Sequence, residues 1–202
     1  MIDQSAADEF TPEVPPVDQE RIERAVREIL LAIGEDPERD GLLGTPGRVA
    51  RMYAEQFAGL RQEPEDVLTT VFDAEHDEIV LVRDIDMYSM CEHHLVPFNG
   101  KMHIGYIPSN AVIGISKLPR IAEMFARRLQ VQERLTKEVA NAVMDVLKPQ
   151  GVAVVMESSH LCMVMRGVQK TGSTTITSCV LGCFERKEKT RNEFLSLIGV
   201  NR

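Results

Sequence analysis

Two short groups of cysteine and histidine residues carry the side chains best suited to chemistry. Residues 91–94 read Cys-Glu-His-His, and a second group contains His160 and Cys162. Cys91 and His94 are separated by two residues, a spacing that lets one tight turn direct a thiolate and an imidazole at the same point. Cys162 could supply a third ligand through the fold. Since thiolate and imidazole are the ligands that Zn²⁺ prefers, these residues indicate a zinc site.

The spacing alone leaves three interpretations of this set. In a catalytic site, Cys91, His94 and Cys162 would bind the ion and leave a fourth position for water, whose pKa falls towards roughly 7 on zinc. In a structural site the fourth position would be closed by a protein ligand, for which the candidates are His93, His160 and Cys179. Without a metal, the same residues would be buried cysteines and hydrogen-bonded histidines.

The remaining cysteines favour packing over chemistry. The chain holds four cysteines, and 202 residues without an export signal can fold without disulfides, so thiols or metal ligands are expected. Cys179 and Cys183 lie four apart in a stretch of alternating polarity, which predicts that both face one side of a strand. Small apolar side chains in that position are typical of core packing.

Apolar periodicity predicts the elements that position these residues. Apolar residues in 22–33 recur at helical spacing, and the helix can be capped by Asp18 and ended by Gly34. Thr45 followed by Pro46 predicts the start of a second helix that ends before Gly59.

Beyond residue 75 strands and helices are segregated along the chain. Residues 79–88 and 101–107 are rich in β-branched and large apolar residues and predict an antiparallel pair, with 91–100 as a loop. Helices are predicted at 119–129, 131–147 and 192–198, and further strands at 152–157, 162–165 and 173–184. This segregation predicts an α+β fold with a largely antiparallel sheet.

Composition limits the classes of function. The formal net charge is −8 and the pI is about 5.2, which argues against a general nucleic-acid or membrane-surface binder. The longest apolar runs, such as 152–156, are far shorter than the roughly 20 residues that cross a bilayer. Without a visible secretory signal we expect a cytosolic protein.

The domain organisation follows from the same composition. Residues 1–17 contain Pro12, Pro15 and Pro16 and few large apolar groups, which predicts an extended tail. We expect one domain over 18–202, with N-terminal helices in 18–75 and a core in 76–202.

Five separated motifs resemble the GTP cyclohydrolase I family, and they occur in the same order. They are Thr45-Pro-Gly-Arg48, Cys91-Glu-His-His-Leu-Val-Pro97, Gly114-Ile-Ser-Lys-Leu-Pro-Arg120, Gln130-Val-Gln-Glu-Arg-Leu-Thr136 and His160-Leu-Cys-Met-Val-Met-Arg-Gly167. The similarity covers roughly residue 18 to the end of the chain.

This resemblance implies an activity and an assembly. The activity is conversion of GTP and water to formate and 7,8-dihydroneopterin triphosphate, the entry to pterin and folate-type cofactors. The fold is the tunnelling fold, an antiparallel sheet with helices packed on one face and an N-terminal helical extension. The assembly is a homodecamer of two stacked rings of five, with sites at subunit interfaces.

The resemblance also implies a role for each matching residue. Zinc is held by Cys91, His94 and Cys162, and His93 and His160 remain unligated as proton carriers. Glu133, assisted by Gln132, binds the guanine base, because a carboxylate can accept from both N1–H and the 2-amino group. The triphosphate is bound by Ser116, Lys117, Arg120, Arg166 and, from a neighbouring subunit, Arg48. His76 and His103 match no motif and are expected to be structural.

Two other functions are compatible with parts of the pattern. The related 7-cyano-7-deazaguanine reductase shares the tunnelling fold but uses a cysteine nucleophile and NADPH without catalytic zinc. A zinc-stabilised binding module would hold a saturated metal and have no turnover. The full set of Cys91, His94 and Cys162 disfavours the reductase.

Overall fold

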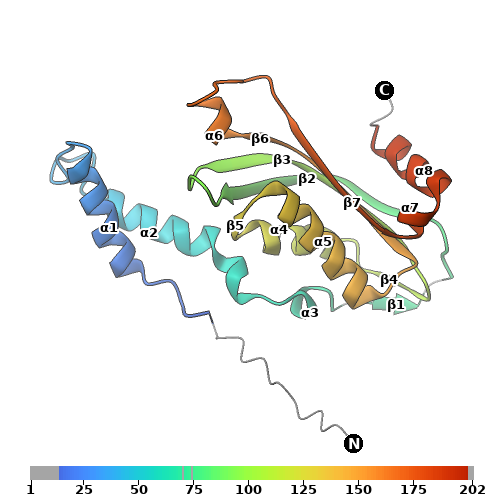
Figure 1. The fold of residues 1–202 in the computed structure, drawn as a ribbon. Helices are drawn as coiled ribbons and strands as arrows, with labels where there is room; N and C mark the ends of the chain where they lie inside the picture. Colours follow the sequence, from blue (N-terminus) through green and yellow to red (C-terminus); the bar gives the residue numbers. More distant parts are fainter. Residues whose placement is uncertain (1–13, 70, 74, 200–202) are drawn as a thin grey trace, which may run out of the picture. The chain divides into compact units, whose positions relative to one another are not determined.

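The computed structural model describes residues 14–69, 71–73 and 75–199 (Figure 1). The chain forms two compact units that divide between Ala54 and Glu55, and each is described by itself. Residues 1–13 of the predicted tail lie outside the described residues.

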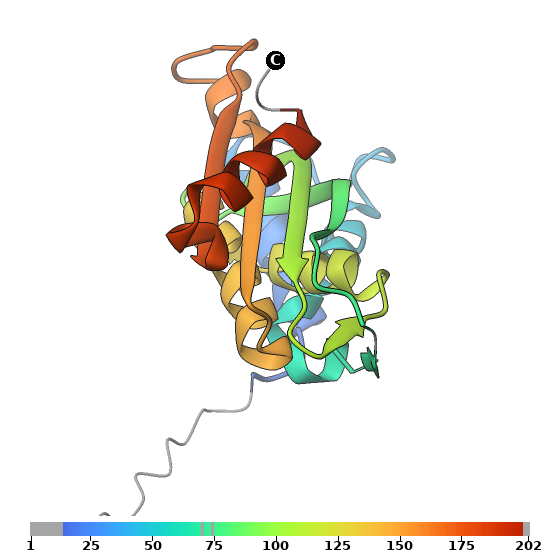
Figure 2. The same ribbon diagram turned by 90° about the vertical axis from the view of Figure 1, so that its right-hand side faces the viewer.

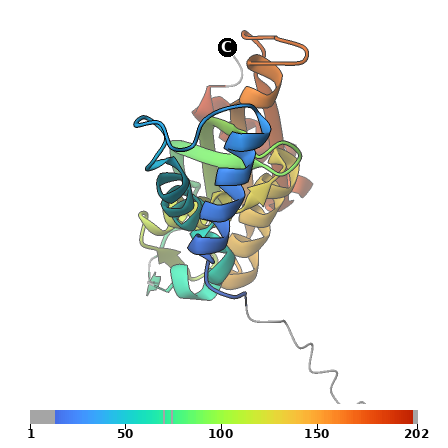
Figure 3. The same cartoon turned by 90° about the vertical axis from the view of Figure 1, so that its left-hand side faces the viewer.

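The first unit is built on two helices, both close to their predicted positions (Figure 3). Helix α1 (Gln19–Ala32) is capped by Asp18, whose side chain accepts a hydrogen bond from the Arg21 N–H at 2.9 Å. The chain leaves α1 through Gly34, which has a φ of +86°. Helix α2 (Thr45–Gln56) begins at the predicted Thr-Pro pair and runs across the division between the units.

The second unit is organised by a five-stranded sheet. Its strand order is β5-β2-β3-β6-β7, formed by Leu129–Gln130, Val80–Cys91, Pro97–Ile107, Gly151–His160 and Thr175–Gly182. All pairs are antiparallel except β2 with β5, which run parallel at Met90 and Cys91. Strands β1 (Val71–Asp73) and β4 (Ala111–Ile113) form a separate two-stranded sheet. The predicted α+β class with an antiparallel sheet is confirmed.

Two helices cover one face of the large sheet, as predicted. They are α4 (Lys117–Ala126) and α5 (Gln132–Leu147), preceded by the short turns η1 (Ala58–Arg61) and α3 (Pro64–Val67). The sheet contributes Met102, Ile104 and Val154 to the core, and the helices contribute residues at helical spacing, such as Ile121 and Val139; all are fully buried.

Part of the opposite face is covered by the end of the chain. The short helix α7 (Cys183–Arg186) packs on β6 and β7, and α8 (Glu188–Ile198) crosses β6 and β3 there (Figure 2). Phe194 packs against Gly105, where a Cβ would lie only 2.8 Å from the ring, so any larger residue would displace the ring. Strand β6 is therefore buried on both sides, with Val154 in the first core and Val155 in the second.

Two predicted elements around the site are wrong. Residues 162–165 are not a strand, because β6 continues to His160 and the chain then turns through helix α6 (Leu161–Val164). A short apolar run fits either type, and periodicity cannot distinguish them. The predicted loop 91–100 is shorter than expected, since Pro97 already pairs with Met90 in β3.

Cys179 and Cys183 do not share a face, contrary to the prediction. Strand β7 ends at Gly182, whose φ of +64° is costly for other residues, and Cys183 begins α7. Cys179 packs against the first core and Cys183 belongs to the second. Both nevertheless serve packing, as expected.

His103 holds together an irregularity between β2 and β3. The register shifts between Val82 and Ile85, and Asp84 adopts a φ of +60° there. The Asp84 N–H donates to Nδ1 of His103 at 3.1 Å, and His103 is 3% exposed. The structural role expected for this histidine agrees with this contact.

We expect stability to fall below about pH 6.5 in a manner that depends on His103. Burial lowers its pKa, an effect that Arg83 and Lys101 strengthen and that Asp84 and Glu157 oppose. The unfolded chain therefore binds the proton more tightly, so stabilisation present above pH 6.5 is lost as the pH falls, by up to about 1.4 kcal/mol per pH unit.

Urea unfolding at pH 7.5 and 5.5 measures this loss. His103→Asn places an acceptor that does not titrate near the position of Nδ1, and the variant should show a shallower decrease between the two pH values. An equal decrease in both proteins would show that His103 does not contribute.

Candidate active site

Cys91, His94 and Cys162 form a compact group of ligand atoms. Cys91 ends β2, His94 lies in the turn that follows and Cys162 lies in α6. Their ligand atoms all lie within 4.8 Å of one another, and Cys91 Sγ is 3.8 Å from His94 Nδ1. Tetrahedral zinc with ordinary bond lengths places sulfur and nitrogen ligands about 3.6 Å apart. The group therefore fits a zinc ion.

The two thiols support the same interpretation. Burial raises the pKa of Cys162, the neighbouring Cys91 raises it further, and Arg166 opposes both effects. The surroundings of Cys162 thus favour its neutral thiol, and a divalent cation would reverse that preference by binding the thiolate.

Backbone hydrogen bonds shape the turn that carries Cys91 and His94. The Cys91 N–H donates to the Val96 carbonyl at 3.0 Å, and the Leu95 N–H donates to the Cys91 carbonyl at 2.9 Å. Leu95 has a φ of +52°. These contacts close the turn before β3 begins and keep both ligands on one side of it.

A charged network joins this turn to the start of α5. The Glu92 N–H donates to the Gln130 carbonyl at 3.0 Å, and the Glu92 carboxylate pairs with the Arg134 guanidinium. Arg134 Nε also donates to Gln130 Oε1 at 3.0 Å. The Arg134 guanidinium lowers the pKa of Glu92, so the carboxylate stays ionised. The turn and α5 are thus tied together.

His93 and His160 lie beside the ligand group and do not belong to it. Within the described residues the group holds only Cys91, His94 and Cys162, and Cys179 is also outside it. The His93 side chain is 64% exposed, and its ring meets that of His94 edge-on at 6.2 Å. A closed structural site with one of the three candidate fourth ligands finds no support in this geometry.

The His160 ring is held by its surroundings. It stacks on Phe98, with ring centroids 4.6 Å apart and planes 6° apart. Its Nε2 lies 2.8 Å from Gln132 Oε1. Burial lowers the pKa of His160, and the nearby Glu133 carboxylate partly opposes this. Phe98 was not anticipated, although its place four residues after His94 could have indicated it.

One pocket contains seven of the predicted site residues. It measures about 240 Å³. Its lining includes the three candidate metal ligands together with His93, His160, Gln132 and Glu133. Glu133 is exposed in the first turn of α5, next to the buried Gln132. The structure therefore brings a candidate metal-binding group, two imidazoles outside that group and a carboxylate to one cavity.

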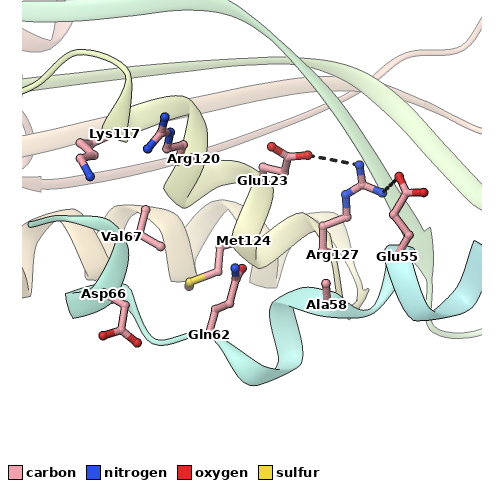
Figure 4. Close-up of a pocket in the computed structure, with 10 residues that line it drawn as sticks. All are labelled: Glu55, Ala58, Gln62, Asp66, Val67, Lys117, Arg120, Glu123, Met124 and Arg127. Carbon is pink, nitrogen blue, oxygen red and sulfur yellow. Dashed lines mark hydrogen bonds and ion pairs between the residues drawn. The ribbon is translucent and has the colours of Figure 1, made fainter. Parts of the chain in front are cut away.

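Three predicted phosphate ligands lie elsewhere in the second unit. Lys117 and Arg120 line a cavity of about 500 Å³ along α4, beside the ion pairs of Arg127 with Glu55 and Glu123 (Figure 4). Exposed Ser116 directly precedes α4.

The length of α4 separates these groups from the candidate metal ligands Cys91, His94 and Cys162. The C-terminal end of α4 is the end near Cys91, because the Ala126 carbonyl accepts a hydrogen bond from Ser89 Oγ at 2.7 Å. Lys117 lies at the opposite end of the helix. The ten residues of α4 span about 15 Å. Within one chain, Lys117 is therefore remote from Cys91.

The other two predicted phosphate ligands are also distributed. Arg166 follows α6, and its charge favours the Cys162 thiolate. Arg48 lies on α2 of the first unit, where its guanidinium donates to Thr45 Oγ1 at 3.0 Å and to the Gly41 carbonyl at 3.3 Å. It shares a groove of that unit with Arg24 and Arg51.

Comparison with known proteins gives a consistent result. The sequence profile of the family described as GTP cyclohydrolase I matches residues 22–199. A Neurospora crassa protein named GTP cyclohydrolase 1 is 70% identical over 188 residues, which is 91% of this chain and 60% of that protein. Proteins of the same name from Thermobifida fusca and Saccharomyces cerevisiae are 64% and 59% identical, over 90% of this chain and 89% and 76% of their own lengths.

Among solved structures, the archaeosine synthase QueF-Like in the apo form is similar at a TM-score of 0.44 and 18% identity. The match covers 52% of this chain and 94% of that chain. Across the part of the chain that the structure describes, every helix is too short or too polar to cross a bilayer.

Proposed function

The chain belongs to the GTP cyclohydrolase I family, and from this we propose that it opens the imidazole ring of GTP, releasing formate and forming 7,8-dihydroneopterin triphosphate. One observation beyond the family carries the proposal. Cys91, His94 and Cys162 share a pocket with two imidazoles outside the ligand group and one carboxylate. Hydrolytic opening of a purine ring is promoted by a metal-activated water, by proton carriers and by a group that recognises the base, and residues suited to each of these roles line the pocket.

We infer that the ion is Zn²⁺, held by Cys91, His94 and Cys162. When bound, zinc supplies an activated water at neutral pH. The donor set of two thiolates and one imidazole supports zinc over Mg²⁺ or Ca²⁺, which prefer oxygen ligands.

The protein side chains would recognise the base and move protons. Glu133 would accept from N1–H and the 2-amino group of guanine, and adenine lacks this donor pair. Breaking a bond between C8 and a ring nitrogen requires a proton on the leaving nitrogen, and the formamide that results must then be hydrolysed. His93 and His160 are the imidazoles within the pocket that would carry these protons.

We expect a homo-oligomer, and the family resemblance implies a decamer. The separation of Lys117 and Arg120 from the metal pocket supports this. When the guanine of GTP is bound at Glu133, its triphosphate needs cations nearby. Lys117 and Arg120 of a second copy could supply these cations, and Ser116 could donate a hydrogen bond. Arg48 is proposed to contribute to the same group.

Zinc analysis and a formate-release assay with GTP on one purified sample test the proposal. We expect about one zinc per chain and formate release that stops when a chelator removes the metal and returns with Zn²⁺. A reductase would need NADPH and no zinc, whereas a binding module would hold zinc and release no formate. Either of those results would refute the proposed activity.

We expect Glu133→Gln to lower kcat/KM for GTP by roughly 10- to 100-fold, because a hydrogen bond to a charged group contributes about 1.5–3 kcal/mol. Formate release over a range of GTP concentrations measures this. Asp145→Asn makes the same change of charge at an exposed position of the same helix and should behave like the unmodified protein. An unchanged kcat/KM in Glu133→Gln would remove this residue from base recognition.

A further inference from the structure

All the hydrogen-bonding positions of the Gln132 side-chain amide have partners inside the protein. Gln132 is 1% exposed. Its Nε2 donates to the carbonyl oxygens of Met156 and Thr175, both at 3.0 Å. Its Oε1 accepts from Ser158 Oγ at 2.5 Å and lies 2.8 Å from His160 Nε2. Two donors and two acceptor sites are all that a glutamine amide possesses.

These partners determine which way the amide points. Backbone carbonyls can only accept, so the NH₂ group must face Met156 and Thr175. The amide oxygen therefore faces His160, and an oxygen of this kind cannot donate. It follows that His160 Nε2 carries a hydrogen and donates it to Gln132. In a neutral imidazole the other nitrogen, Nδ1, then holds a free lone pair.

The Nδ1 atom of His160 remains available for a further hydrogen bond. Within the described residues, no hydrogen bond involves His160 Nδ1, and every buried side-chain nitrogen or oxygen has a partner. Nδ1 is thus not a buried atom, and His160 lines the pocket. The stacked Phe98 ring fixes the plane in which this nitrogen lies.

We propose that Gln132 is a positioning residue that holds His160 as the Nε2–H tautomer, so that Nδ1 is the atom that exchanges protons with the substrate. Nδ1 accepts the proton released by the water that adds to C8 and passes it to the nitrogen whose bond to C8 breaks, while the hydrogen on Nε2 stays on the ring throughout. This inference rests on the proposed function and replaces the base-binding role that the family resemblance implies for the Gln132 side chain. Its amide has no group left for a base.

The tautomer can be measured directly on the unmodified holoenzyme. Histidine labelled with ¹⁵N gives separate signals for protonated and unprotonated ring nitrogens, and the His160 signals are those lost in His160→Ala. At a pH where the ring is neutral we expect a protonated Nε2 and an unprotonated Nδ1. The opposite tautomer would overturn the proposal.

Kinetics test whether Gln132 acts through His160. We expect Gln132→Met to lower kcat by about 10- to 100-fold, the usual range for a residue that supports a functional side chain, with KM for GTP changed less than about twofold. In the His160→Ala background the same change should have less than about a twofold further effect. Gln150→Met makes the same substitution directly before the start of β6, whereas His160 ends that strand, and it should alter neither constant.

The possible failures are distinguishable. A raised KM with unchanged kcat in Gln132→Met, or an equal loss with and without His160, would show direct contact with the base and overturn the inference. If Gln132→Met does not fold, the tautomer of the unmodified protein still decides. If the unmodified protein releases no formate from GTP, the proposed function and the proton transfer are both refuted. The measured tautomer of His160 still tests whether Gln132 positions that ring.

Discussion

Cys162→Ala should lose both the bound metal and formate release. Cys162 supplies one of three ligand atoms within 4.8 Å of one another, and Cys91 and His94 alone leave two coordination positions unfilled. Changes in residues that only support a metal ligand cost 10- to 100-fold in affinity or activity, so loss of a ligand should exceed about 100-fold. Metal analysis after gel filtration and the formate assay measure the two effects.

Cys183→Ala is the matched control for this change. Cys183 is equally buried but lies in the second core, away from the pocket. We expect it to keep the metal and the activity and to lose only a little stability. Full zinc content in Cys162→Ala would exclude Cys162 from the ligand group.

His160→Ala should separate metal binding from turnover. His160 lies outside the ligand group, so its loss should leave about one zinc per chain. Proton transfer by a positioned side chain contributes typically 10²- to 10⁴-fold, and we expect kcat to fall within that range. Zinc content and kcat are measured on the same preparation.

His76→Ala provides the comparison for His160→Ala. His76 is exposed and lies outside the pocket of the metal group, so neither quantity should change. If His160→Ala were purified without zinc, the division between ligands and proton carriers would be wrong.

The helices and long strands could be predicted because their signals are local. The cap at Asp18, the Thr45-Pro46 start and the apolar stripe of α5 each depend on residues within a few turns. Strand β5 could not be predicted, since its two residues are strand only through pairing with β2. Helix α6 was missed because four apolar residues have no distinctive period.

The part of the site formed by cysteine and histidine could be predicted, because few other residue types bind metal ions through sulfur or nitrogen. Cysteine and histidine spacing indicated Cys91, His94 and Cys162 as one possible ligand set, the family resemblance selected it, and the structure brings these three residues together. The hydrogen bonds of Gln132 had no such signal, because two of its partners are backbone carbonyls that every residue possesses. The pair of Glu92 and Arg134 joins residues far apart in the chain, and surface charges are too common for sequence to match them.

Because Cys162 is far from Cys91 and His94 in the sequence, the cation binds the folded chain more tightly than the unfolded chain. Cys162 reaches the group from 71 positions beyond Cys91, and an unfolded chain could present all three ligands only by closing that loop. Closing it would cost about 4 kcal/mol of chain entropy. In the folded chain the sheet already holds the two segments together, so binding requires no further loss of chain entropy. An ion bound by all three residues therefore acts as a cross-link that stabilises the folded state.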